Sequence, residues 1–190
     1  MSERLFKVLA RNERGELVSC NGGTQTWTPG VKVCAHDRGP LVACHNGIHL
    51  CRPEDLLHWL NEVICPVTRR SGERIIEVDK VVVRWAVIGE PLPTWNDRTA
   101  RLFACDCAEW VLCLIENPDP RSIDAVRVSR LFAVGKATAV ELAAARAAGD
   151  AAWAAAWDAA WDAGDTARAA ASEYMAERLM QYLDGEADDE

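Results

Sequence analysis

The sequence lacks a long apolar run and an excess of positive charge. Across its 190 residues, no stretch approaches the roughly 20 consecutive apolar residues that a membrane span needs. The opening residues Met1–Arg4 lack the charged and then apolar layout of a signal peptide, so we expect a soluble, cytoplasmic protein that does not bind a membrane. Lys and Arg number 21 against 29 Asp and Glu, for a net charge of -8. This balance argues against nucleic acid as a partner, because proteins that bind a phosphate backbone usually present a basic face.

The familiar motifs of catalytic and metal sites are also missing. No Cys-x-x-Cys pair occurs, and Asn21–Gly23 lacks the lysine and the helix start of a phosphate-binding loop. Cysteines, histidines and acids that could form a nucleophilic set exist, but no spacing selects them. The sequence therefore favours a non-catalytic protein and leaves an enzyme open as the alternative.

Acidic residues gather in the second half of the chain. Residues 1–93 carry 12 basic and 11 acidic side chains, whereas residues 94–190 carry 9 and 18. Between the halves, the prolines of Gly89–Pro93 remove backbone donors and end the strand-like region. We therefore predict a cysteine-rich α/β domain over residues 1–93, an acidic helical domain over 94–184 and a disordered acidic tail over 185–190.

Short apolar runs separated by turn residues predict a small mixed or antiparallel sheet in the first half. The expected strands are Leu5–Leu9, Val31–Cys34, Leu41–Cys44, Gly47–Cys51, Ile75–Val78 and Val81–Val87. We expect Val31–Cys34 and Leu41–Cys44 to pair through a turn at Asp37–Gly39. The segment Pro53–Leu60 has a proline and acids in its first turn and apolar residues at helical spacing, which predicts one short helix.

Helix formers dominate the second half and predict an Ala/Trp-rich bundle of three to four helices, which makes the fold class α+β. The expected helices run from a cap at Thr94 or Asn96 to about Glu116, from Asp119–Pro120 to Gly135, and from the capping box Thr138–Glu141 to Leu183, with a break at Gly149 or, preferably, Gly164. On the first helix, one face carries Phe103, Cys107, Trp110 and Leu114. The ladder of Trp153, Trp157 and Trp161 fits a bundle core, and a surface for self-association is the alternative.

Eight cysteines in a chain with no export signal are expected to be free thiols, which raises the question of metal binding. Ligand-type side chains are densest between Cys34 and Cys51, and His49 and Cys51 are two apart, on one face of an extended strand. Zinc binds such residues in tetrahedral sets, so the candidate ligands of a structural zinc are Cys34, Cys44, His49 and Cys51. No other cofactor is expected.

The cysteines of the helical half have a different interpretation. The cysteine two residues before Cys107 lies about 200° away around the helix axis, so the two cannot share one ion. We expect Cys107 and Cys113 to be buried core residues. We expect Asp106 to pair with an arginine of its own or a neighbouring helix, such as Arg98 or Arg101.

The stretch Ala43–Asp55 contains the order Cys-His-Asn-Gly-Ile-His-Leu-Cys, and a further cysteine, Cys20, lies upstream. It resembles a domain family of phage and bacterial proteins whose members show an early cysteine, a Cys-x-x-Gly-aromatic-His-x-Cys core, a short helix and a closing acidic strand. Here Ile48 stands at the aromatic position. The family has no assigned activity, so the resemblance implies a fold for Cys20–Val83 and no function.

The stretch Trp95–Glu109, together with the Ala/Trp-rich run after it, is similar to the immunity proteins of bacterial toxin loci. That resemblance implies a protein partner. A third resemblance is to ADP-ribosyltransferase folds, in which a Gly-x-His strand leads into a helix and a later strand carries a glutamate. Gly47–His49 and Glu77 fit that order, although the early Arg-Gly or His-Gly signature is missing. The resemblance implies a nucleotide pocket with His49, Cys51, Arg52 and Glu77 as binding residues.

Together these features predict a non-catalytic binding protein of a phage or bacterial conflict system, which presents an acidic helical surface to a protein partner. One alternative is a nucleotide-binding or ADP-ribosyltransferase-like pocket in the first half. The other is a structural protein that assembles into homo-oligomers through the tryptophan ladder.

Overall fold

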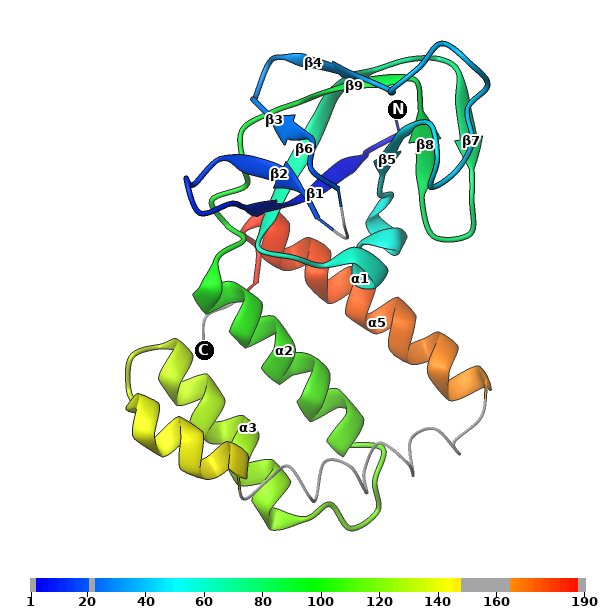
Figure 1. Ribbon diagram of the computed structural model, residues 1–190. Helices are drawn as coiled ribbons and strands as arrows, with labels where there is room; N and C mark the ends of the chain where they lie inside the picture. The colour runs from blue at the N-terminus through cyan, green and yellow to red at the C-terminus, as the bar shows by residue number, and fades with distance from the viewer. Residues whose placement is uncertain (1–2, 21–22, 148–164, 188–190) are drawn as a thin grey trace. The chain divides into compact units, whose positions relative to one another are not determined.

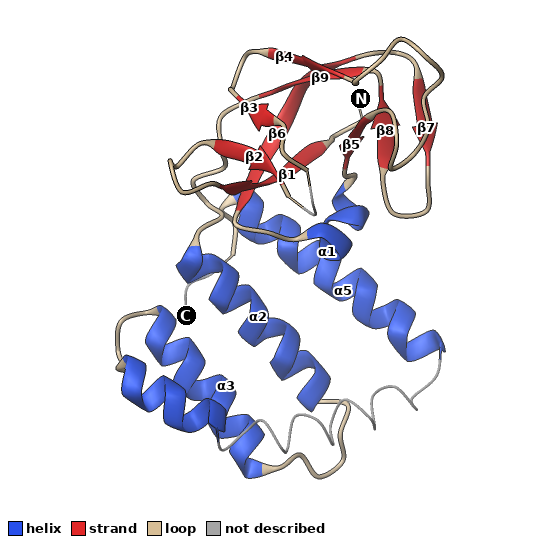
Figure 2. Cartoon of the chain, in the orientation of Figure 1, coloured by secondary structure: helices blue, strands red, loops and turns tan. Residues whose placement is uncertain are grey.

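The computed structural model describes residues 3–20, 23–147 and 165–187. The chain divides into two compact units, Met1–Trp95 and Asn96–Glu190, and the division falls two residues after the predicted boundary. Strands and one short helix make up the first unit, and long helices make up the second (Figure 2). The predicted α+β class is confirmed.

Two antiparallel sheets form the first unit (Figure 1). The larger sheet has the strand order β3-β2-β1-β6-β9-β4, and the smaller has the order β5-β8-β7. The bounds are β1 (Phe6–Arg11), β2 (Leu17–Ser19), β3 (Thr26–Trp27), β4 (Lys32–Cys34), β5 (Ile48–Leu50), β6 (Val63–Arg70), β7 (Arg74–Ile76), β8 (Val81–Val83) and β9 (Trp85–Ile88). Every pair of neighbouring strands is antiparallel, so of the mixed and antiparallel sheets predicted, the structure has the antiparallel type.

An isolated β-bridge connects β1 of the larger sheet with Cys51, directly after β5. Phe6 and Cys51 exchange two main-chain hydrogen bonds, each 2.8 Å long. The β-branched valines of β8 pack on the other side of β5 and are fully buried. The bridge therefore holds β5 beside β1 and places His49 of β5 near Lys7 of β1.

Several predicted strands need correction. The segment Leu41–Cys44 is not a strand, because the main-chain oxygen of Val42 accepts bonds from His45 and Asn46 and closes a tight turn. Its expected partner, β4, pairs instead with β9, far along the chain. Val81–Val87 forms two strands of different sheets, separated at Arg84. The strands β2, β3 and β6 were not predicted.

The short helix is confirmed. A 3-10 turn, η1 (Pro53–Asp55), continues into α1 (Leu56–Trp59). Proline at the first position suits a helix start, because its missing N–H is not needed there. Leu56 is completely buried and anchors the helix in the first unit.

In the second unit, α2 lies between α3 and α5 (Figure 1). The bounds are α2 (Asp97–Leu112), α3 (Pro120–Ala133) and α5 (Asp165–Asp184), and residues 139–147 are also helical. Asn96 caps α2, Asp119 caps α3, and Thr138 with Glu141 forms the capping box predicted. None of the helices in the described part of the chain is both long and apolar enough to cross a membrane.

The buried face of α2 differs from the prediction. The helix ends at Leu112, four residues early, and leaves Leu114 52% exposed. Cys113 is exposed and Cys107 is half-buried, so neither is the buried core residue expected. The buried thiol is instead that of Cys105, whose Sγ lies 3.7 Å from the main-chain oxygen of Val126 on α3.

The start of the predicted disordered tail is ordered. Gly185 adopts φ 73°, and its N–H and that of Glu186 bond back to α5, as in a glycine C-cap. Residues 188–190, the tryptophan ladder at 153–161 and both predicted helix breaks lie outside the described residues.

Candidate functional site

Two neighbouring cavities lie in the first unit. Their volumes are about 610 and 210 Å³, and they share four lining residues: Lys7, Cys20, Cys44 and His49. Among the described residues, no aspartate or glutamate lines either cavity, although the chain carries 29 of them. The linings therefore combine basic and neutral groups in an acidic protein.

Lys7 occupies β1, between the buried residues Leu5 and Leu9 that share its face of the strand. Its Nζ donates a hydrogen bond to the main-chain oxygen of His49 at 3.1 Å and lies 5.3 Å from the centre of the Trp27 ring. Burial lowers the pKa of Lys7, because the ammonium loses hydration in this position. The structure thus places an amine where its charged form is disfavoured.

The second lysine of the smaller cavity has a different environment. Lys80 Nζ lies 3.0 Å from a carboxylate oxygen of Asp79 and 4.9 Å from the centre of the Trp59 ring, and its bond to Asp79 raises its pKa. Lys7, by contrast, has no carboxylate partner anywhere in the described ranges. Of the two lysines that line the smaller cavity, Lys7 is therefore the one whose ammonium is free to pair with the anionic group of a ligand.

His49 lies on β5, opposite Val82 of β8. Its Nε2 accepts a hydrogen bond from the main-chain N–H of Cys44 at 3.0 Å, so the proton of the neutral ring is assigned to Nδ1. Burial, and then the positive charges of Lys7 and Lys80, lower the pKa of His49. The imidazole is therefore neutral at pH 7 and holds Cys44 in its left-handed conformation, at φ 61°.

Two of the thiols around the cavities, those of Cys51 and Cys20, have defined surroundings. Burial raises the pKa of Cys51 to about 12, so this thiol stays protonated at neutral pH. Cys20 donates a weak bond from its Sγ to the main-chain oxygen of Val8 at 3.6 Å. In its ionised form, either thiol would raise the pKa of Lys7.

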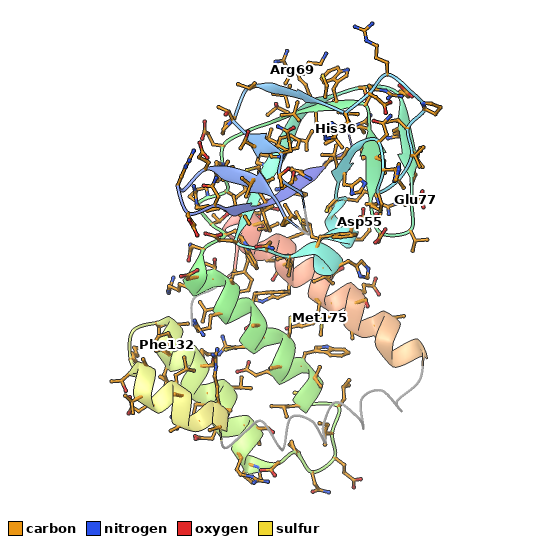
Figure 3. All side chains as sticks on the ribbon, in the orientation of Figure 1. His36, Asp55, Arg69, Glu77, Phe132 and Met175 are labelled. Atoms are coloured by element: carbon orange, nitrogen blue, oxygen red, sulfur yellow. The ribbon has the colours of Figure 1, made fainter. Side chains whose placement is uncertain are left out.

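Two of the predicted binding residues lie apart from the cavities. Arg52 forms a two-pronged pair with the buried carboxylate of Asp55 and donates to the main-chain oxygens of Glu77 and Val78. It ties the short helix to the β7–β8 hairpin. Figure 3 shows Asp55 at that helix and Glu77 at the hairpin turn, and Glu77 lines neither cavity. His49 and Glu77 therefore do not share the lining of either cavity, and the pocket that the ADP-ribosyltransferase resemblance implies stays a prediction.

The predicted zinc ligands are only partly assembled. Cys34, Cys44 and His49 line the larger cavity, and Cys44, His49 and Cys51 line the smaller. Within residues 3–20, 23–147 and 165–187, no group of three or more His, Cys, Asp or Glu is arranged to hold a metal ion. A structural zinc on these residues stays a prediction.

Sequence reasoning found His49 and the cysteines but missed Lys7. The signal was present, because a lysine interrupts the apolar run Leu5–Leu9 at a position whose neighbours two residues away are core leucines. A charged residue on the core face of a strand needs a partner, a cavity or both.

Comparisons with protein-family models, with curated proteins and with solved structures find no match to this chain. The three resemblances noted from the sequence therefore stay predictions.

Proposed function

We propose that the first unit is a non-catalytic binding module for a small anionic ligand of up to nucleotide size, held in the cavities around Lys7. The observation that carries this proposal is Lys7 itself: a half-buried lysine without a carboxylate partner among the described residues, facing cavities whose described linings contain no acid.

The physical reason is charge balance. A cation in a poorly hydrated site is destabilised until a negative charge approaches, and the attraction is larger there than in water. In the native protein no described carboxylate supplies that charge to Lys7, so a ligand would gain the interaction on binding. The larger cavity, at about 610 Å³, also falls within the range of about 300–1,000 Å³ typical of ligand sites.

Calorimetry with adenosine monophosphate and with uncharged adenosine tests the proposal, because the two probes differ by the phosphate. We expect the monophosphate to bind more tightly, and we expect Lys7→Met to weaken it by about 10–100-fold, the value of one hydrogen bond to a charged group. Lys32→Met is the matched control, since Lys32 also lies over a tryptophan ring, at 4.4 Å from that of Trp85, but is exposed and lines neither cavity.

Equal affinity for both probes, or equal effects of the two lysine variants, would remove the proposal. A panel of phosphate, pyrophosphate and dicarboxylates extends the test to anions without a base.

The protein partner predicted from the acidic helices remains a second proposal, in a narrower form. Several carboxylates of the helical unit are already neutralised within it, by the pairs Asp119–Arg121, Asp124–Arg127 and Glu109–Arg130. A partner would therefore meet fewer free charges than the composition suggests. Loss of partner capture on Glu173→Lys and Glu177→Lys, two acids with no ion pair among the described residues, would support it, and unchanged capture would oppose it.

A further inference from the structure

The cavities bring together two kinds of nucleophile: the amine of Lys7 and the thiols of Cys20, Cys44 and Cys51. Which of them can react with an electrophile depends on which one is in its neutral or ionised reactive form. An amine reacts when it has lost its proton, and a thiol reacts as the thiolate.

Burial shifts the pKa values of the amine and of the Cys51 thiol in opposite directions. It lowers the pKa of Lys7 and so favours the neutral, nucleophilic amine. The same loss of hydration raises the pKa of Cys51 to about 12 and keeps that thiol protonated. Of Lys7 and Cys51, the amine of Lys7 is therefore the group whose reactive form burial favours.

The contacts of Lys7 leave its amine able to react. Its one hydrogen bond to a described residue, the main-chain oxygen of His49 at 3.1 Å, uses one N–H. A neutral amine then keeps one N–H and its lone pair for a ligand in the cavities that it lines. No described carboxylate holds the group in the ammonium form, in contrast to Lys80, which pairs with Asp79.

From this geometry we infer that Lys7 captures an anionic aldehyde or ketone reversibly, as an imine. The amine nitrogen attacks the carbonyl carbon and a C–N bond forms. The carbonyl oxygen then leaves as water with the two hydrogens of the amine, so the C–O bonds are replaced by C=N and no oxidant or reductant is needed. The inference rests on the proposed function, because the same nitrogen attracts the anion as an ammonium and keeps a positive charge beside it as a protonated imine; it adds the carbonyl to the ligand class.

Borohydride trapping is the direct test. The full chain is incubated with pyridoxal 5′-phosphate, an aldehyde that carries a phosphate, then reduced and digested with trypsin. The chain has four lysines, and cleavage after Arg4 and Arg11 isolates Lys7 as the one lysine of its peptide, away from the terminal amine. We expect most of the label on Lys7, a loss of that label in Lys7→Arg, and weaker labelling by pyridoxal, which lacks the phosphate. Label spread evenly over Lys7, Lys32, Lys80 and Lys136, or absent from Lys7, would overturn the inference.

Lys7→Arg also separates the two proposals, because arginine keeps the positive charge but forms no comparable imine. If the wild-type chain binds adenosine monophosphate but is not trapped at Lys7, the imine is wrong and the anion site survives. If neither occurs, both are wrong.

Discussion

Replacing Asp106 by asparagine tests the polar network at the centre of the helical unit. The carboxylate lies on α2, and its side chain is only 7% exposed. It accepts three hydrogen bonds, from Arg130 of α3 at 2.7 Å, from Arg178 of α5 at 2.6 Å and from Tyr182 of α5 at 2.9 Å. Asp106→Asn removes the charge and turns one acceptor oxygen into an NH₂ group that faces donors.

The size of the effect follows from what remains unpaired. Breaking a buried ion pair costs about 3–5 kcal/mol, because the surviving charge stays buried. Here the arginine side chains are 24% and 23% exposed, and each keeps another partner, Glu109 for Arg130 and Gln181 for Arg178. We therefore expect a loss of about 2–4 kcal/mol in the free energy of unfolding of the helical unit at pH 7.

The loss should also depend on pH. Burial alone would raise the pKa of Asp106, but its bonds to Arg130, Arg178 and Tyr182 outweigh burial and lower that pKa. A lowered carboxylate pKa contributes stability above the ordinary value of about 3.9 and loses it as the pH falls through the lowered value. The difference between wild type and Asp106→Asn should therefore shrink in acid.

Urea denaturation, with hydrogen exchange of α2, α3 and α5 peptides, measures the effect. Asp124→Asn on α3 is the matched control, since it makes the same chemical change in an exposed pair with Arg127. We expect no resolvable loss in the control. Equal stability of the two variants at pH 7 would refute the assignment of Asp106 as the link between the helices.

Three further predictions concern the first unit. Gly47→Ala should destabilise the first unit strongly, because the added Cβ would overlap a valine of β8. Gly72→Ala is the control, since its new methyl group would lie in open space, and we expect it to leave the melting temperature in thermal unfolding unchanged. Arg52→Ala should lower stability by about 2–4 kcal/mol, because it removes the guanidinium from the buried Asp55 and leaves that carboxylate with the main-chain N–H at position 52. Unchanged urea denaturation would contradict that structural role. Burial lowers the pKa of His49 below its ordinary value of 6.5, so the neutral ring should stabilise the fold fully above pH 6.5. As the pH falls from 6.5 through the lowered pKa, that stabilisation should be lost. In a pH series of melting curves, His49→Gln should show a smaller loss over this range.

The helix starts could be predicted because each depends on a few adjacent residues. Asn96 accepts bonds from the N–H groups two and three residues on, and Asp119 accepts from the residue two ahead. Such caps are local, so the sequence contains them in full. The end of α2 was harder, since no glycine or proline directly follows Leu112 to mark it.

The strand pairings could not be predicted in the same way. β4 pairs with β9, and β1 with β6, across long segments that contain other strands, and nothing near β4 in the sequence identifies that partner. Leu41–Cys44 has the composition of a strand, but the hydrogen bonds of the Val42 turn, together with Asn46 bonded to Asp37, determine its conformation. Tertiary contacts outweigh strand propensity in such short segments.

In the candidate site, too, residues that are close in sequence could be predicted to lie together, and residues from distant strands could not. His49, Cys44 and Cys51 are close in sequence, so their proximity could be anticipated from spacing. Lys7 and Trp27 come from separate strands, and only the folded chain shows that the amine lies beside the ring and beside His49. The physical meaning of Lys7 therefore depends on contacts that no local pattern contains.

The most direct test of the account is an NMR titration of the lysine side chains, which are few enough to assign one by one. In the free protein, Lys7 should titrate below the ordinary lysine range of about 10.4 and Lys80 above it. Saturation with adenosine monophosphate should raise the pKa of Lys7, because a bound phosphate stabilises the ammonium. An ordinary pKa for Lys7 that does not change on addition of the nucleotide would contradict the central claim that Lys7 is a half-buried amine whose charged form is disfavoured until an anion binds.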